Sequence, residues 1–147
     1  MREILFKAKR LDNGEWVEGY YMRHENRMLA PMGDTLKDED VDHIILFSGF
    51  ADWNMQRNIK YVKVDPSTVC EWTGLIDKNG TKVFEDDRLL DPHENIIFVV
   101  AYDPLETGFT LKDEIGRYVG VCRASYSKII GSIHDGEGAQ SEGIALE

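Results

Sequence analysis

The chain has 147 residues, of which 42% are hydrophobic and 10% are aromatic. This length suits one domain with a full core or two small subdomains, and the composition excludes a chain that is disordered throughout. The formal net charge of −10 argues against a clamp for nucleic acid, because the phosphate backbone would repel the protein.

The charge is unevenly distributed along the sequence. Residues 1–27 carry six Lys or Arg against five acidic side chains, a net charge of +1, whereas the remainder carries 11 against 22, a net charge of −11. The excess of acidic side chains therefore lies in residues 28–147.

Cys70 and Cys122 are the only cysteines. Two thiols are too few for a disulfide scaffold, and they lack the paired spacing of a zinc site. We expect two buried thiols in a cytoplasmic protein. No secretory signal precedes the first predicted strand, and no apolar run approaches the roughly 18 residues that a membrane-spanning helix needs.

The N-terminal part begins with an alternating pattern over residues 2–10, which predicts a half-buried strand with Phe6 and Ala8 on one face. The turn residues 11–14 and a second strand over 15–22 complete a β-hairpin. Residues 23–42 read as a loop with room for one short helical turn. A strand over 41–47 follows, then a turn or a single helical segment over 48–57, and another strand over 59–64. Asp65 and Pro66 form a helix-start signature with room for one turn.

A β-hairpin over residues 69–84 is the clearest element of the sequence. Asp77 can accept backbone N–H groups in its turn, and Gly80 can take a positive φ, which suits a type I turn closed by a G1 bulge. After it come the three adjacent carboxylates Glu85, Asp86 and Asp87, named here the carboxylate corner.

Four further strands are predicted beyond this corner. The run 96–102 is apolar at every position, which marks it as the centre of the core. Shorter strands are expected over 108–112, 118–122 and 128–134, the last with Gly131 as a bulge or close-approach site.

Together these elements predict a mainly β fold, or a β-dominated α+β fold, with many short strands joined by turns. We expect an N-terminal β-hairpin region with an irregular insert over residues 1–64. A small SH3-like barrel is expected over 65–134, and a flexible tail over 135–147. The first two parts form either one compact unit or two subdomains.

Five segments together form a recognisable pattern: REILFKAK at 2–9, GEWVEG at 14–19, DPSTV at 65–69, WTGLIDKNGTKVFEDD at 72–87 and IGSI at 130–133. With these segments the chain resembles the YopX family, small proteins encoded by phages and prophages. Where that family usually has Glu-Gly-Asp, this chain has Glu85, Asp86 and Asp87. The resemblance implies a phage-related cytoplasmic protein and brings no established activity or catalytic residue.

No residue pattern identifies a catalytic, cofactor or metal site. The four histidines are far apart in sequence, and no phosphate-binding glycine loop or nucleophile elbow is present. The best chemical candidate is the carboxylate corner with Asp91, His93 and Glu94, which could hold a divalent cation or supply an acid/base pair. The simpler interpretation is that these carboxylates accept backbone N–H groups, because adjacent strand residues point to opposite faces. Five aromatic residues could form a recognition patch but are more typical of a core: Tyr20, Tyr21, Trp53, Trp72 and Tyr118.

These observations favour a non-catalytic binding or regulatory module that acts by contact. We expect a protein partner or self-association through strand edges, no membrane association and little affinity for nucleic acid. One alternative is an acidic mimic of nucleic acid that inhibits a host protein. The other is a divalent-metal-dependent enzyme that uses residues 85–87.

Overall fold

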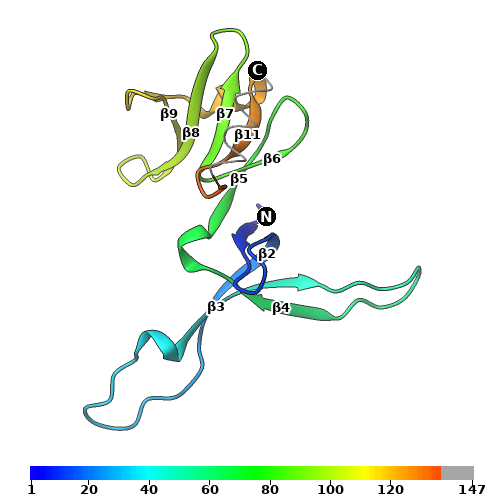
Figure 1. Ribbon diagram of the computed structural model, residues 1–147, viewed down its shortest axis with the longest axis vertical. Coiled ribbons are helices and arrows are strands. Elements are labelled where there is room, and N and C mark those ends of the chain that lie inside the picture. Colours follow the sequence, from blue (N-terminus) through cyan, green and yellow to red (C-terminus); the bar gives the residue numbers. More distant parts are fainter. Residues whose placement is uncertain (137–147) are drawn as a thin grey trace. The chain divides into compact units, whose positions relative to one another are not determined.

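The computed structural model describes residues 1–136, and it divides the chain into two compact units. The N-terminal unit is Ile4–Val69, and the C-terminal unit is the chain from Cys70 onward together with Met1–Glu3. Both units consist mainly of antiparallel β-strands, as the sequence predicts (Figure 1).

The N-terminal unit contains β1 (Phe6–Lys9), β2 (Trp16–Glu25), β3 (Val41–Ser48) and β4 (Ile59–Lys63). Each strand pairs antiparallel with the next, so that β1 to β4 form a meander, named here the N-terminal sheet. The first hairpin is confirmed, and Gly14 adopts a φ of 72° in its turn. Only a residue that tolerates a positive φ fits there without strain.

The core of this unit lies on one face of the N-terminal sheet. Ala8, Ile45 and Val64 are fully buried, and Phe6 and Tyr21 pack against them. Neighbouring positions along a strand point to opposite faces. Tyr20, next to Tyr21, therefore points away from the core cluster, to what we name the outer face.

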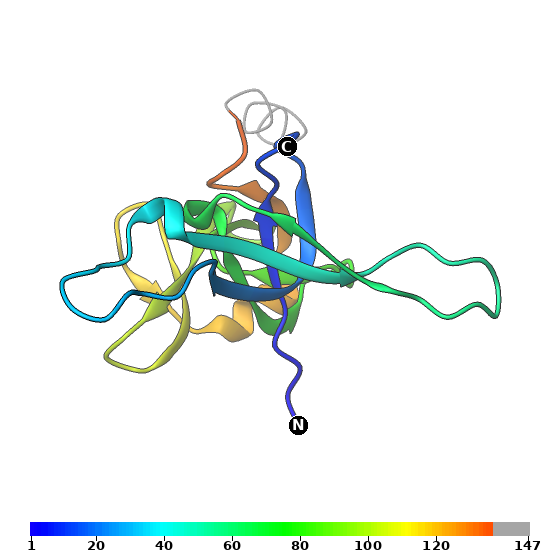
Figure 2. The same cartoon turned by 90° about the horizontal axis from the view of Figure 1, so that it is seen from below.

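Two long connections leave β3 at its opposite ends (Figure 2). Residues 26–37 lead from β2 to the 3₁₀ turn η1 (Asp38–Asp40), which is the single helical turn expected in this stretch. Residues 49–58 join β3 to β4 without a helix, so the turn interpretation holds for this segment. A second 3₁₀ turn, η2 (Pro66–Thr68), begins where predicted, and Asp65 Oδ1 accepts a hydrogen bond from the Ser67 N–H over 3.0 Å.

The C-terminal unit begins with the predicted hairpin of β5 (Cys70–Ile76) and β6 (Lys82–Phe84). In its turn Gly80 has a φ of 82°, and Asp77 Oδ1 accepts the N–H groups of Asn79 and Thr81 over 2.9 Å each. The other oxygen of Asp77 accepts the Ile129 N–H over 3.1 Å, which ties the turn to the last strand.

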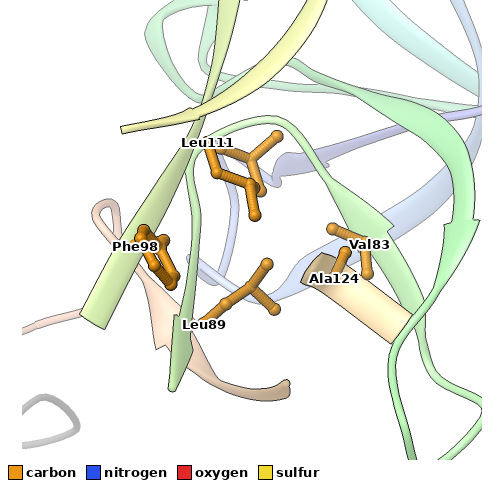
Figure 3. Close-up of a cluster of buried hydrophobic side chains, with 6 residues drawn as sticks. Val83, Leu89, Phe98, Leu111 and Ala124 are labelled. Carbon is orange, nitrogen blue, oxygen red and sulfur yellow. The ribbon is translucent and has the colours of Figure 1, made fainter. Parts of the chain in front are cut away.

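A five-stranded antiparallel sheet forms the rest of the unit, in the order β10-β9-β8-β7-β11. The predicted central run occupies its middle strand, and Phe98 and Val100 are buried in the core there. Figure 3 shows Phe98 with Leu89 and Leu111 of the same core. Gly131 lies at an irregularity of the pairing between β11 and β7, as predicted. The strands are β7 (Asp87–Asp91), β8 (Ile96–Asp103), β9 (Gly108–Lys112), β10 (Tyr118–Val119) and β11 (Lys128–Ser132).

The predicted closure into a barrel is wrong. The strands β10 and β11 form opposite edges of the five-stranded sheet, and β10 is only two residues long. In addition, β6 and β7 are consecutive but belong to different sheets, because a tight turn at residues 85–86 separates them. The ladder therefore does not continue from the hairpin into the sheet.

The segment after β10 also differs from the prediction. The chain enters the 3₁₀ helix η3 (Val121–Tyr126) at a point where a strand was expected to continue to Cys122. Cys122 is exposed on this helix, so the prediction that both thiols are buried holds for Cys70 alone. Of the predicted tail, residues 137–147 lie outside the described part of the chain.

Candidate functional site

Three side chains from distant parts of the sequence meet in the C-terminal unit. Cys70 is the first residue of β5, Asp86 lies in the turn between β6 and β7, and His134 follows β11. The cysteine sulfur, one carboxylate oxygen and one imidazole nitrogen all lie within 4.8 Å of one another. We name these three residues the Cys–Asp–His cluster.

The backbone holds Asp86 in a conformation that suits glycine. Its φ is 66°, in the left-handed region, which costs free energy for a residue with a side chain. Its N–H donates to the Val100 carbonyl over 2.9 Å, and its own carbonyl accepts the Ile133 N–H over 3.0 Å. The backbone here thus has a conformation that glycine adopts most readily, and the aspartate adds a carboxylate to it.

This carboxylate connects the other two members of the cluster. His134 Nε2 lies 2.8 Å from Asp86 Oδ2, and the Cys70 thiol donates to the same oxygen over 3.8 Å. The Cys70 side chain is completely buried, whereas the side chains of His134 and Asp86 are 19% and 29% exposed. The cluster is therefore accessible to solvent from the side of Asp86 and His134.

Glu85, next to Asp86 in the sequence, interacts electrostatically with the cluster. Burial raises the pKa of Glu85, and the negative charges of Asp86 and Glu71 raise it further, while His134 acts in the opposite direction. Glu71 also lies 3.8 Å from Arg2 in an ion pair.

The predicted carboxylate corner does not act as one group. Asp87 is buried, and its Oδ2 accepts the Phe84 N–H over 2.8 Å. Asp91 likewise accepts the His93 N–H over 2.9 Å. These two carboxylates accept hydrogen bonds from backbone N–H groups, as the simpler interpretation predicts. Of the three adjacent carboxylates, only Asp86 belongs to the Cys–Asp–His cluster.

Sequence reasoning missed Cys70 and His134. No short motif joins them, because β5, the β6–β7 turn and the end of β11 meet only through folding. The single local signal is Asp86, a charged residue at a position where the turn favours glycine.

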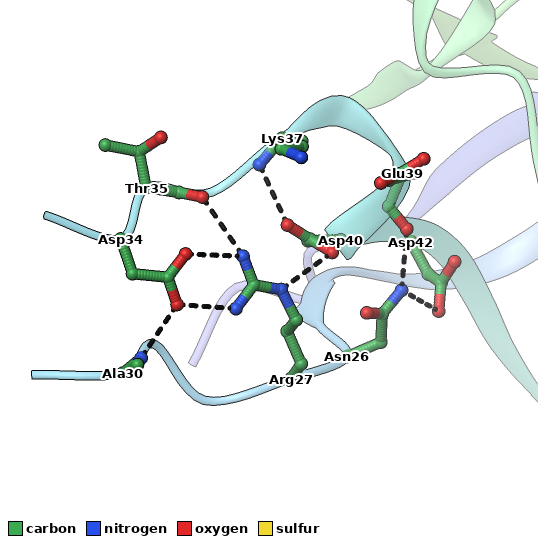
Figure 4. A network of polar contacts seen from close by, with 9 residues as sticks. All are labelled: Asn26, Arg27, Ala30, Asp34, Thr35, Lys37, Glu39, Asp40 and Asp42. Atoms are coloured by element: carbon green, nitrogen blue, oxygen red, sulfur yellow. Dashed lines mark hydrogen bonds and ion pairs between the residues drawn. The ribbon is translucent and has the colours of Figure 1, made fainter.

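A second polar cluster closes the β2–β3 connection (Figure 4). The Arg27 guanidinium donates to both carboxylate oxygens of Asp34, over 2.7 and 3.0 Å, and contacts Asp40 over 2.9 Å. Its hydrogen bonds lower the pKa of both aspartates. The same carboxylates accept the N–H groups of Ala30 and Lys37, so this network fixes the loop.

The five aromatic candidates divide into two groups. Tyr21 and Trp72 are half-buried, and the indole N–H of Trp72 donates to the Leu75 carbonyl over 2.9 Å. Tyr20, Trp53 and Tyr118 are exposed. The first group is thus structural, and the second is available for contact.

A comparison with curated proteins finds none that matches the chain. None of the helices within residues 1–136 has the length and apolar character needed to cross a membrane. The sequence model of the family described as "YopX protein" matches residues 7–137, which is most of the chain. The chain therefore belongs to the YopX family.

Proposed function

We propose that the protein is a non-catalytic binding module that associates with a second copy of itself through apolar side chains of the N-terminal unit. The observation that carries this proposal is the exposure of large apolar side chains in the β3–β4 connection. Phe50 and Trp53 are 91% and 94% exposed, and Met55 in the same loop is also exposed. Aromatic side chains of this kind are the typical anchors of protein interfaces.

The outer face of the N-terminal sheet supplies a matching surface. Tyr20, Leu46 and Tyr61 stand opposite one another across β2, β3 and β4. Tyr20 and Tyr61 are exposed, and so is Ile59 on the same strand as Tyr61. Contiguous apolar patches of this kind on a protein surface mark interaction sites.

Charge and strand order support a second copy as the partner. The N-terminal unit carries nine basic and 11 acidic side chains, a net charge of −2, while the C-terminal unit carries eight and 16, a net charge of −8. Two N-terminal units therefore repel each other least. Strand β4 is also a sheet edge, and each copy carries both an apolar loop and an apolar face. A two-fold arrangement can pair such surfaces reciprocally.

Light scattering and sedimentation over a range of protein concentrations test this proposal. We expect oligomers at high micromolar concentration, and we expect Trp53→Ser and Tyr61→Lys each to weaken the association. Tyr126→Lys is the matched control, because Tyr126 and Tyr61 are both 64% exposed but lie in different units. A protein that stays monomeric throughout, or that loses association equally with Tyr126→Lys, would contradict the proposal.

Tryptophan fluorescence gives an independent measurement. An association that covers Trp53 shifts the emission to shorter wavelength as concentration rises, because the indole leaves water. Trp53→Phe should abolish this shift while Trp16 and Trp72 still contribute to the spectrum. A shift that persists in Trp53→Phe would place the contact elsewhere.

A second candidate function is mimicry of nucleic acid by the C-terminal unit. Its net charge of −8 favours this candidate, since a basic groove on a host protein would attract it. Affinity capture from a bacterial lysate should then recover nucleic-acid-binding proteins, and higher salt should release them. Recovery that does not depend on salt would exclude this candidate.

A further inference from the structure

We propose that Cys70, Asp86 and His134 form a binding site for one Zn²⁺ ion. This inference is independent of the proposed self-association, because it concerns the C-terminal unit alone. It assigns a ligand to the Cys–Asp–His cluster, which takes no part in the proposed self-association.

The donor atoms are those that zinc prefers. Zn²⁺ binds cysteine sulfur, histidine nitrogen and carboxylate oxygen, and three such protein ligands leave one tetrahedral position for water. Mg²⁺ and Ca²⁺ instead require several oxygen ligands. A set with one thiol, one imidazole and one carboxylate therefore selects zinc over the hard cations.

The spacing of the donor atoms fits the ion. Zinc bonds of about 2.0–2.3 Å in a tetrahedron place neighbouring ligand atoms roughly 3.3–3.8 Å apart. In the cluster, Asp86 Oδ2 lies 2.8 Å from His134 Nε2 and 3.8 Å from Cys70 Sγ. A shift of Nε2 by about half an ångström brings the shorter distance to the lower end of this range, and the longer distance already lies at its upper end.

The fold brings the three ligands close together before any ion arrives. Both backbone polar groups of Asp86 are hydrogen-bonded, to Val100 and to Ile133, and His134 directly follows Ile133. Cys70 is completely buried at the start of β5.

A catalytic cysteine fits this geometry less well than a metal. A nucleophilic cysteine needs a histidine in direct contact as its base and access to substrate. Here Asp86 Oδ2 is the partner shared by the thiol and the imidazole, and the thiol is completely buried. Zinc binding needs only a thiolate and an imidazole nitrogen with a free lone pair as ligands.

Competition with a chromophoric zinc chelator, together with elemental analysis after dialysis, tests the proposal on the full chain. We expect one Zn²⁺ per chain and no binding of Mg²⁺. Removing one ligand by Cys70→Ser, Asp86→Gly or His134→Ala should weaken affinity by more than about 100-fold, beyond the effect of outer-shell changes. Co²⁺ in place of zinc should give a sulfur-to-cobalt charge-transfer band that Cys70→Ser removes.

Two matched controls separate the site from incidental binding. Cys122 is the other thiol and is exposed, and His93 is exposed on a turn. Cys122→Ser and His93→Ala should keep wild-type zinc affinity and the cobalt band. The proposal fails if wild-type protein binds no zinc, or if these controls lose binding while His134→Ala keeps it. Circular dichroism confirms folding, and Asp86→Gly serves as the decisive variant because its backbone conformation suits glycine.

Discussion

His134 Nε2 lies 2.8 Å from Asp86 Oδ2, although the two residues are 48 positions apart in the sequence. The contact joins the end of the last strand to the tight turn that leads into the five-stranded sheet. Asp86 makes this contact from a backbone conformation with a positive φ, which costs free energy for a residue that carries a Cβ atom.

Two substitutions at this position distinguish the free-energy cost of the backbone conformation from the contribution of the carboxylate to stability. Asp86→Gly and Asp86→Ala both remove the contact with His134, but only glycine relaxes the positive φ. We therefore expect Asp86→Ala to have a free energy of unfolding about 1 kcal/mol lower than Asp86→Gly. Urea unfolding measures this difference, and equal stabilities would show that the turn stores no strain.

Leucine truncation tests the position of the core. Leu89 is completely buried in β7, whereas Leu105 is 93% exposed in the β8–β9 turn. Leu89→Ala should lower the free energy of unfolding by about 2–5 kcal/mol, and Leu105→Ala by less than about 0.5 kcal/mol. Similar losses for the two variants in urea unfolding would mean that Leu89 is no more buried than Leu105.

Asp77 connects the central hairpin to β11, and its removal should affect both. The carboxylate is buried and accepts three backbone N–H groups, those of Asn79, Thr81 and Ile129. Asp77→Ala leaves these donors without their partner, so we expect a loss of about 3 kcal/mol. Asp103→Ala, which removes only an exposed hydrogen bond to the Leu105 N–H, should cost within about 1 kcal/mol. Hydrogen exchange at Ile129 should accelerate in Asp77→Ala alone; unchanged protection there would contradict the link.

The Arg27 network predicts a pH dependence of the β2–β3 connection. Arg27 lowers the pKa of Asp34 and Asp40 in the folded protein below the ordinary value near 3.9. A lowered folded pKa means that the carboxylates stabilise the loop fully above that value, and that the stabilisation is lost as pH falls toward the folded pKa values. Hydrogen exchange at the Ala30 and Lys37 amides should therefore lose protection below about pH 4.

Arg27→Met is the control for this pH dependence. Without the guanidinium, both aspartates should titrate nearer the ordinary value, so the loss of protection should move to higher pH. An unchanged profile in Arg27→Met would show that the backbone alone orders the loop.

Local patterns were sufficient to predict most of the strands. Gly14 and Gly80 mark turns whose flanking residues alternate, so both hairpins follow from interactions between near neighbours. The run that contains Phe98 and Val100 is apolar throughout, and it occupies the middle of the sheet. These features depend on periodicity and turn chemistry, which a single sequence contains.

The remaining features depend on contacts between distant residues. The barrel was predicted because five short strands suggest closure, but the positive φ of Asp86 directs β6 and β7 into different sheets. Residues 121–126 contain Val and Cys, which favour strands, yet the backbone there forms η3. The Cys–Asp–His cluster needs three elements to be in place, and no spacing in the sequence encodes it.

The pairing of β11 with β7 has a consequence for synthesis on the ribosome. Residues 87–91 leave the ribosome before their partner strand over 128–132, which emerges only after β8, β9, β10 and η3. Until then β7 presents an open hydrogen-bonding edge next to buried leucines, a template for pairing between nascent chains. A chain shortened before residue 128 would carry this edge permanently, and it should accumulate as insoluble aggregates.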